Sequence, residues 1–401
     1  MKLLVYSHFF APSVGGVETI VLSLARGLAE LRDSNGAPQF ELTLVTQTPA
    51  GNWDDKAVPF RVIRQVTVVQ LARLIRESDV VHVAGPALAP LTLGLLFGKP
   101  TVVEHHGFHA ICPNGQLLLE PSGEPCPGHF MAGRQTECLR CNSVEGWVAS
   151  YRLWLLTYLR RFLCQHAAAN ITPTQWLGGL LQLPRGAAIL HGLNDVAPLS
   201  RVEMRSGAPV IAFVGRLVTT KGVRILFEAA GILGQKHRPF DMLIVGDGPE
   251  RQSLEELARK SGLGSRVRFA GRLGGEQLEV ELAGATVAVV PSLGGEVFGL
   301  VVAENMLRGL PVVASDLGAL AEVLGDAGLT FRTGDAAELA AAIESLLDNP
   351  SLAARLGQAG RQRASEFCNR ERMIESHAAV YRNLVSAERD ECSHARAVVV
   401  E

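Results

Sequence analysis

Short apolar runs recur along the whole chain, and most are rich in Val, Ile and Thr without alternation of polar and apolar positions. Such runs are typical of strands buried on both faces of a parallel sheet. In the first half they predict strands at residues 3–6, 41–46, 80–83, 101–103 and 170–172. In the second half they predict strands at residues 210–214, 242–245, 267–269, 286–290, 312–314 and 329–331.

Helical patterns lie between many of these runs. The first keeps one apolar face at a period near 3.6, through Val17, Ile20, Val21, Leu24, Leu28 and Leu31. Alternation of strands and helices over 401 residues predicts an α/β protein of two Rossmann-like, doubly wound domains.

A polar segment at 193–208 marks the expected domain boundary, because the strand–helix rhythm restarts directly after it. We therefore predict an N-terminal domain at 1–195, with a cysteine-bearing loop at 112–146, and a C-terminal domain at 208–365. Apolar residues recur at helical spacing over 366–387 and predict a final helix there.

Composition and charge exclude several classes of protein. The chain has 38 Lys and Arg against 40 Asp and Glu, so bulk charge gives no reason to expect nucleic-acid binding. No run approaches the ~20 apolar residues of a membrane span. The first residues do not resemble a signal peptide, so we expect a cytoplasmic protein whose seven cysteines are reduced.

Candidate binding residues follow the predicted strands, where open α/β sheets bind their ligands. Gly15 and Gly16 precede the first helix, and paired glycines allow a backbone to approach a phosphate at a helix N-terminus. A tight turn explains the pair equally well. No G-x-G-x-x-G follows a strand, which argues against a dinucleotide-dependent oxidoreductase.

The second half carries two further strand-end motifs. Arg216 and Lys221 are five residues apart on a Gly-containing loop that opens a helix, and such a pair can clamp a diphosphate. Singly, each cation is more often a solvated surface group. Gly246 and Gly248 end the next strand and permit close backbone approach, although the motif also fits an ordinary turn.

The most specific motif is GGEVFGLVVAENMLRGLPVVASD, in which seven residues separate Glu296 from Glu304. A helix beginning near Gly299 places Glu304 one to two turns inside it. Glu304 lies among apolar residues, and a carboxylate there needs a partner such as a sugar or ribose hydroxyl.

GGVE, GRLVTTKG, VGDGPE and E-x7-E, in this order, resemble the retaining glycosyltransferases of the GT-B fold, family four (glycosyl transferases group 1). The resemblance implies two domains facing across a cleft, with the final helix crossing back to the N-terminal domain. It implies a UDP- or GDP-sugar donor on the C-terminal domain and a saccharide or lipid-linked acceptor on the other. The implied activity moves a hexose-type sugar in polysaccharide or glycolipid biosynthesis.

The same resemblance implies roles for individual residues. Arg216 and Lys221 would hold the diphosphate, and Glu296 would contact the transferred sugar. His106, in EHHGFH, matches the active-site histidine beside that sugar. The remaining donor-binding residues would be Gly16, Gly246, Phe298, Gly299, Leu300 and Glu304, the last on the ribose.

No Asp-x-Asp occurs in the chain, so an obvious carboxylate site for Mg²⁺ or Mn²⁺ is missing. This agrees with the metal-independent habit of the family. In their implied roles Glu296 and Glu304 do not flank the scissile bond, as the carboxylates of a retaining glycosidase do. We therefore expect front-face transfer without a cofactor, in which the leaving diphosphate helps to deprotonate the acceptor. A nucleotide-sugar epimerase or hydrolase and a non-catalytic nucleotide-sugar-binding protein are the alternatives.

Two segments of the first half allow two interpretations each. Cys112, Cys126, Cys138 and Cys141 could form a structural zinc site, although irregular spacing before Cys138 favours reduced thiols. Residues 147–163 mix aromatic and aliphatic residues with arginines. They fit either an amphipathic helix on an anionic membrane surface or a core helix with its arginines in water.

Overall fold

The computed structural model describes residues 1–120, 122–142, 146–194, 196–199 and 207–398, with side chains as far as Ala387. The expected boundary at 193–208 falls in part on residues 195 and 200–206, which lie outside the described residues. The chain divides into two compact units. The first contains Met1–Gly115, Cys138–Leu193 and Asn369–Glu401, and the second contains Gln116–Glu137 and Asn194–Cys368. Part of the cysteine-bearing loop thus groups with the second unit.

The first unit is built on a seven-stranded parallel sheet in the order β3-β2-β1-β4-β5-β8-β9. Its strands are β1 (Lys2–Ser7), β2 (Glu41–Thr46), β3 (Arg61–Arg64), β4 (Val80–Ala84), β5 (Thr101–Glu104), β8 (Ala169–Thr172) and β9 (Gly186–Ala188). Its helices are α1 (Gly16–Glu30), α2 (Val68–Glu77), α3 (Leu88–Leu96), α5 (Trp147–His166), α6 (Gln175–Leu181) and α14 (Arg370–Val398). The central strands β4, β5 and β8 are buried at every position, as their unalternating sequences predict.

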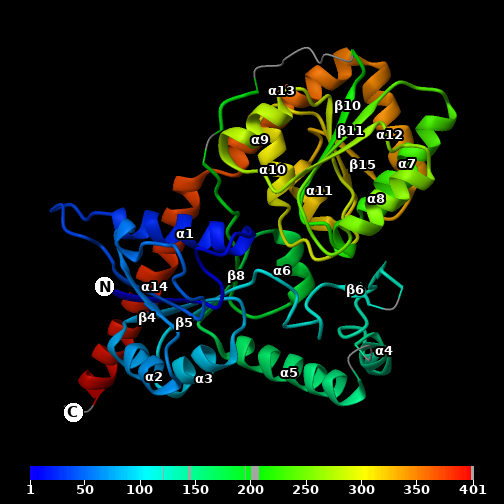
Figure 1. Ribbon diagram of the computed structural model, residues 1–401. Helices are drawn as coiled ribbons and strands as arrows, with labels where there is room; N and C mark the ends of the chain where they lie inside the picture. Colours follow the sequence, from blue (N-terminus) through cyan, green and yellow to red (C-terminus); the bar gives the residue numbers. More distant parts are fainter. Residues whose placement is uncertain (121, 143–145, 195, 200–206, 399–401) are drawn as a thin grey trace. The chain divides into compact units, whose positions relative to one another are not determined.

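The second unit has a six-stranded parallel sheet in the order β12-β11-β10-β13-β14-β15, which is the Rossmann order. Its strands are β10 (Val210–Val214), β11 (Asp241–Val245), β12 (Val267–Gly271), β13 (Val287–Val290), β14 (Val312–Ser315) and β15 (Leu329–Phe331). Its helices, which lie on both sides of the sheet in Figure 1, are α7 (Val223–Gln235), α8 (Arg251–Lys260), α9 (Gly275–Leu282), α10 (Leu300–Leu307), α11 (Gly318–Leu324), α12 (Ala336–Asp348) and α13 (Pro350–Phe367).

Three short elements interrupt this pattern between β5 and α5. They are the antiparallel pair β6 (Leu118–Leu119) and β7 (Glu124–Pro125), followed by α4 (Gln135–Cys141). Among the described residues, no helix is both long and apolar enough to cross a membrane.

A final helix is predicted at 366–387, and its predicted start is wrong. Helix α13 continues to Phe367, and α14 begins only at Arg370. The Asn369 side chain accepts a hydrogen bond from the Arg372 backbone N–H at 2.7 Å, so it caps the new helix. Helix α14 then packs closely on α1, because a Cβ at Gly27 would lie 2.1 Å from Ile374.

Candidate functional site

Glycines let the strand-end loops of the second unit pack tightly against one another. Gly222, at φ 62°, ends the turn that carries Lys221, and a Cβ there would lie 1.9 Å from the Pro291 carbonyl oxygen. This close approach brings the loop after β10 against the loop after β13. A backbone hydrogen bond of 2.8 Å from Leu293 to Thr220 joins the two loops.

Lys221 and Glu296, predicted from separate motifs, meet where these loops pack. The Lys221 ammonium lies 2.5 Å from Glu296 Oε1, with both side chains mostly buried. The Ser292 hydroxyl donates to the same oxygen at 2.8 Å, and the Ser315 hydroxyl donates to the Ser292 carbonyl at 2.7 Å. Ser292 is thus a partner of Glu296 to which sequence reasoning gave no role, although it follows a predicted strand.

The loop after Glu296 leads into α10, whose first N–H groups are uncapped by any side chain. Gly299 lies directly before the helix with φ 93°, and a Cβ there would lie 2.3 Å from Leu320 Cδ2. The Leu300 and Val301 amides precede the first intrahelical hydrogen bonds of α10, so they can bind an anionic group. Phe298 is buried, so its ring is not exposed to a ligand.

Glu304 lies on α10 and is mostly buried. Burial raises the pKa of this carboxyl, and Arg308 lowers it in part. Arg308 is itself engaged by Glu279 through hydrogen bonds of 3.0 and 2.8 Å. A buried carboxylate of this kind gains stability from a hydroxyl donor, as the apolar sequence around it predicts.

The other donor-site candidates of the second unit have different environments. Arg216 is exposed directly after β10. Gly246 has φ 140°, and a Cβ there would lie 1.8 Å from the Gly215 carbonyl oxygen. Close packing of two strand ends therefore explains why Gly246 is a glycine. Its role toward a ligand stays a prediction.

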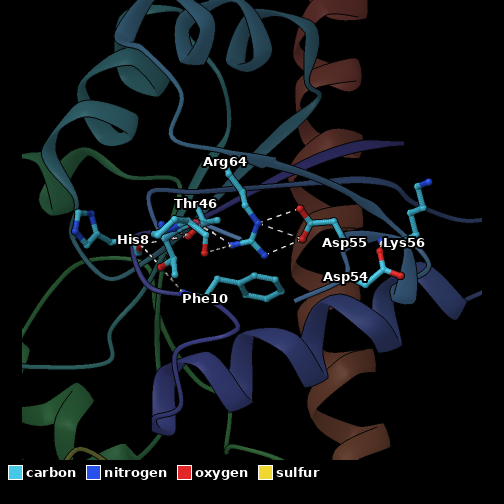
Figure 2. A network of polar contacts seen from close by, with 9 residues as sticks. His8, Phe10, Thr46, Asp54, Asp55, Lys56 and Arg64 are labelled. Atoms are coloured by element: carbon cyan, nitrogen blue, oxygen red, sulfur yellow. Dashed lines mark hydrogen bonds and ion pairs between the residues drawn. The ribbon is translucent and has the colours of Figure 1, made fainter. Parts of the chain in front are cut away.

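In the first unit, the loop after β1 is held by polar contacts with the ends of β2 and β3. The Thr46 hydroxyl donates to the His8 carbonyl at 3.2 Å, while Arg64 is held in place by Asp55 of the segment between β2 and β3, at 2.7 Å (Figure 2). The Arg64 guanidinium also lies 5.8 Å from the centre of the Phe10 ring. This held loop leads to Gly16, the exposed first residue of α1, whose N-terminus no side chain caps.

His106 follows β5, and its ring is nearly buried. Its Nε2 lies 3.3 Å from Glu104 Oε2, and its ring stacks on that of His191 at 5.3 Å between centroids. The neighbouring His105 has another environment, since its Nε2 contacts Asn170 Oδ1 at 2.9 Å. Burial lowers the pKa of His105 to about 4, so this ring is neutral and structural.

Comparison with proteins of known family points to the same class of enzyme as these site residues. Residues 200–363 match the family model described as glycosyl transferases group 1. The match covers the C-terminal part of the chain, which is thus similar to that family. Two similar relatives are the 2-deoxystreptamine glucosyltransferase of Streptomyces kanamyceticus and the phosphatidyl-myo-inositol mannosyltransferase of Mycolicibacterium smegmatis. The first is 32% identical over 53% of this chain and 60% of its own length, and the second is 36% identical over 47% of each. The chain therefore spans no more than 60% of these relatives.

Solved structures with the same fold cover almost the whole chain. Sucrose-phosphate synthase from Thermosynechococcus elongatus has a TM-score of 0.72 at 21% identity, over 96% of this chain and 99% of its own. Anabaena HepE, solved with UDP and glucose, has a TM-score of 0.72 at 19% identity, over 96% and 100%. The chain has the GT-B fold of two Rossmann-like domains, as the resemblance implied.

The four cysteines of the predicted zinc site do not share one unit. Cys112, Cys138 and Cys141 belong to the first unit and are buried, whereas Cys126 belongs to the second. Asn114 contacts two of the thiols, accepting from Cys112 Sγ at 2.9 Å and donating to Cys141 Sγ at 3.7 Å. Zinc on these cysteines stays a prediction.

The core-helix interpretation of residues 147–163 is wrong for one face of α5. Seven large apolar side chains of this helix are between 39% and 86% exposed: Trp147, Val148, Tyr151, Leu155, Tyr158, Leu159 and Phe162. At 3.6 residues per turn they lie within about 120° of arc, and so form one stripe. Arg161 instead turns inward and donates to the Leu181 carbonyl at 2.8 Å.

Proposed function

We propose that this protein is a retaining glycosyltransferase that moves a hexose-type sugar from a UDP- or GDP-sugar to a hydroxyl of a saccharide or lipid-linked acceptor. The observation that carries the proposal is the meeting of Lys221, Ser292 and Glu296 beside the uncapped start of α10. A cation and helix N–H groups suit a diphosphate, and a carboxylate suits sugar hydroxyls. Support also comes from similar proteins named as glucosyl- and mannosyltransferases, and from HepE, which was solved with UDP-glucose.

The ion pair between Lys221 and Glu296 sets the order in which the two parts of the donor are bound. Before the donor enters, Lys221 and Glu296 neutralise each other at 2.5 Å. An arriving diphosphate attracts the Lys221 ammonium, and Glu296 can then accept hydrogen bonds from the sugar hydroxyls. Arg216 and the first amides of α10 add positive charge for the leaving diphosphate. Glu304 accepts from the ribose hydroxyls.

Sugar transfer then proceeds on one face of the ring. The bond between the anomeric carbon and the diphosphate oxygen breaks while the acceptor oxygen bonds to the same carbon from the same side. The departing diphosphate oxygen takes the acceptor's hydroxyl proton, so charge and protons balance. Preorganised cations stabilise the charge that develops on the leaving group, which requires no catalytic metal. His106 positions the transferred sugar.

The acceptor lies in a membrane, and the exposed apolar stripe on α5 binds the protein to that membrane. Trp147, Tyr151 and Tyr158 belong to the residue types that favour the membrane–water interface, and the exposed Arg152 lies beside them. Moving one large apolar side chain of the stripe from water into the membrane contributes about 1.5–3 kcal/mol of favourable free energy. We therefore place the protein on the cytoplasmic face of an anionic membrane, where lipid-linked acceptors lie.

Vesicle co-sedimentation tests this surface. Wild type should sediment with vesicles of anionic phospholipid, and a Trp147→Ser, Tyr151→Ser, Phe162→Ser variant should bind at least tenfold more weakly. The matched control is Val280→Ser, a residue 69% exposed on α9 of the second unit. Wild type that stays in the supernatant would contradict the membrane role. A wild-type dimer that only the α5 variant dissociates would assign the stripe to a second copy of the chain.

A donor-turnover assay tests the activity itself. The protein is incubated with UDP- and GDP-sugars, with and without a lipid and oligosaccharide extract, and released nucleoside diphosphate and transferred sugar are measured. We expect acceptor-dependent transfer from one donor, lost in Glu296→Gln. Release of free sugar at the same rate without acceptor would indicate a hydrolase. Binding without turnover would indicate a nucleotide-sugar-binding protein.

A further inference from the structure

A buried carboxylate in the first unit is surrounded by four histidines from four separate segments. Glu104, at the end of β5, faces His82 of β4, His106, His191 and His377 of α14. The Glu104, His82 and His377 side chains are fully buried, and those of His106 and His191 are at most 5% exposed. The group lies at the carboxyl end of the sheet of the first unit.

The ring nitrogens approach both carboxylate oxygens. His82 Nε2 and His106 Nε2 lie 3.2 and 3.3 Å from Oε2, while His191 Nδ1 and His377 Nε2 lie 3.8 and 3.6 Å from Oε1. Neither oxygen of Glu104 forms a hydrogen bond among the described residues, and neither does Nε2 of His82, His106 or His377. Buried polar atoms left in this state cost free energy unless a further group satisfies them.

Contacts on the other side of two rings fix which nitrogen faces the carboxylate. His377 Nδ1 lies 2.8 Å from the Met373 carbonyl, which can only accept, so this nitrogen carries a proton. His82 Nδ1 lies 2.9 Å from the Tyr381 hydroxyl. In metal sites a ligating histidine holds its other ring nitrogen in this manner, which leaves Nε2 as the ligand atom.

The chemistry of the cluster suits a bound metal cation. Glu104 supplies carboxylate oxygens at the centre of the group, and the four histidines place ring nitrogens 3.2 to 3.8 Å from those oxygens. Imidazoles and one carboxylate form the ligand set of many zinc sites.

We propose that Glu104, His106 and His191 bind a divalent first-row transition metal of the zinc class, with His82 or His377 completing the coordination. The ligand atoms of the first three residues all lie within 4.8 Å of one another. Ligands about 2.0–2.1 Å from a tetrahedral ion lie about 3.3 Å apart, close to the shortest of the distances above. The proposal does not depend on transferase activity.

Such an ion would do two things in this fold. Because His377 and Tyr381 lie on α14, the site would fasten that helix to β4 and β5 of the same unit. A metal on His106 Nε2 would also leave its Nδ1–H as a fixed donor and remove its capacity to act as a base. His106 would then position a substrate hydroxyl and could not deprotonate it.

Metal analysis of the full-length chain, with any histidine tag removed, tests the proposal. We expect about one zinc per chain after equilibration with Zn²⁺ and desalting, and a melting temperature that rises with Zn²⁺. His191→Asn should bind Zn²⁺ at least tenfold more weakly. The matched control, His237→Asn, removes an exposed histidine of the second unit and should change nothing. Circular dichroism of each variant checks that it is folded.

Co²⁺ spectra separate this site from the cysteines. Ligation by nitrogen and oxygen gives visible bands of tetrahedral Co²⁺ without sulfur charge transfer, and Cys138→Ser/Cys141→Ser should keep those bands. A sulfur charge-transfer band lost in that double variant would assign the metal to the cysteines and overturn the proposal. So would a wild-type chain whose metal content and melting temperature Zn²⁺, Co²⁺ and Ni²⁺ leave unchanged. A protonated histidine would then balance Glu104.

Discussion

Replacing Lys221 by methionine removes the ammonium and keeps most of the side-chain stem. In the structure this ammonium lies 2.5 Å from Glu296 Oε1 and is mostly buried. A charge-assisted hydrogen bond to a ligand contributes about 1.5–3 kcal/mol. Its loss should weaken nucleoside diphosphate binding about 10- to 150-fold, since each 1.4 kcal/mol is about tenfold.

The variant has a second effect, because it leaves Glu296 without its cation. At an effective dielectric constant near 20, two like charges about 5 Å apart repel by roughly 3 kcal/mol. Glu296→Gln removes this repulsion. The Lys221→Met/Glu296→Gln double variant should therefore bind nucleoside diphosphate more tightly than Lys221→Met alone. Glu296→Gln by itself should change that affinity little and turnover strongly.

Isothermal titration with the nucleoside diphosphate that stabilises wild type measures these effects. The matched control is Lys236→Met, which removes a more exposed ion pair to Glu344 in the same unit. An affinity of Lys221→Met equal to that of Lys236→Met would refute the assignment of Lys221 to the diphosphate. Strictly additive effects in the double variant would refute the electrostatic coupling.

Two further predictions concern α10 and the turn at Gly222. Burial raises the pKa of Glu304, so its ionisation costs stability as pH rises through that pKa, and the cost is absent below the unfolded pKa. Glu304→Gln should therefore have a higher melting temperature than wild type at pH 8, and this gain should shrink toward pH 4.5. The affinity of the same variant for a nucleoside diphosphate should fall. A melting temperature below that of wild type at pH 8 would contradict the argument. Gly222→Ala should lose roughly 1–3 kcal/mol or more in denaturant unfolding, because its Cβ would lie 1.9 Å from the Pro291 carbonyl oxygen. The control Gly231→Ala, with no atom within 4 Å on α7, should be neutral or stabilising, and equal losses in both variants would refute the steric argument.

The buried strands could be predicted from sequence, whereas the two edge strands of the first sheet could not. Each predicted strand is a strand in the structure, and the bounds agree fully at Glu41–Thr46, Val210–Val214 and Leu329–Phe331. Strands β3 and β9 were missed, because both are short, neither has a fully buried position, and their sequences lack the apolar run that marks the other strands.

The pairing of the donor-site residues needed the order of the strands. Lys221 and Glu296 are 75 residues apart, and they meet because β10 lies next to β13 in the sheet. The motifs indicated both residues, but periodicity does not specify which strand ends are neighbours. The group around Glu104 shows the same limit, since His82 and His377 are far apart in sequence and had no motif.

Helix α5 shows a different limit of sequence reasoning. Its aromatic residues fit a helix, but periodicity alone could not tell whether their face turns inward or outward. In the structure the arginine at 161 turns inward and the aromatic stripe is exposed. Only the packing of the surrounding elements decides such an orientation.

Nucleotide binding by the wild-type chain tests the central claim most directly. A thermal-shift titration would compare UDP, GDP, ADP and dTDP and their sugars, using the intact protein at neutral pH. The account predicts that one diphosphate series raises the melting temperature and that Lys221→Met abolishes the shift at the same ligand concentration. If no nucleoside diphosphate or nucleotide sugar shifts the melting temperature of wild type, the second unit does not contain a donor site and the proposed activity is wrong.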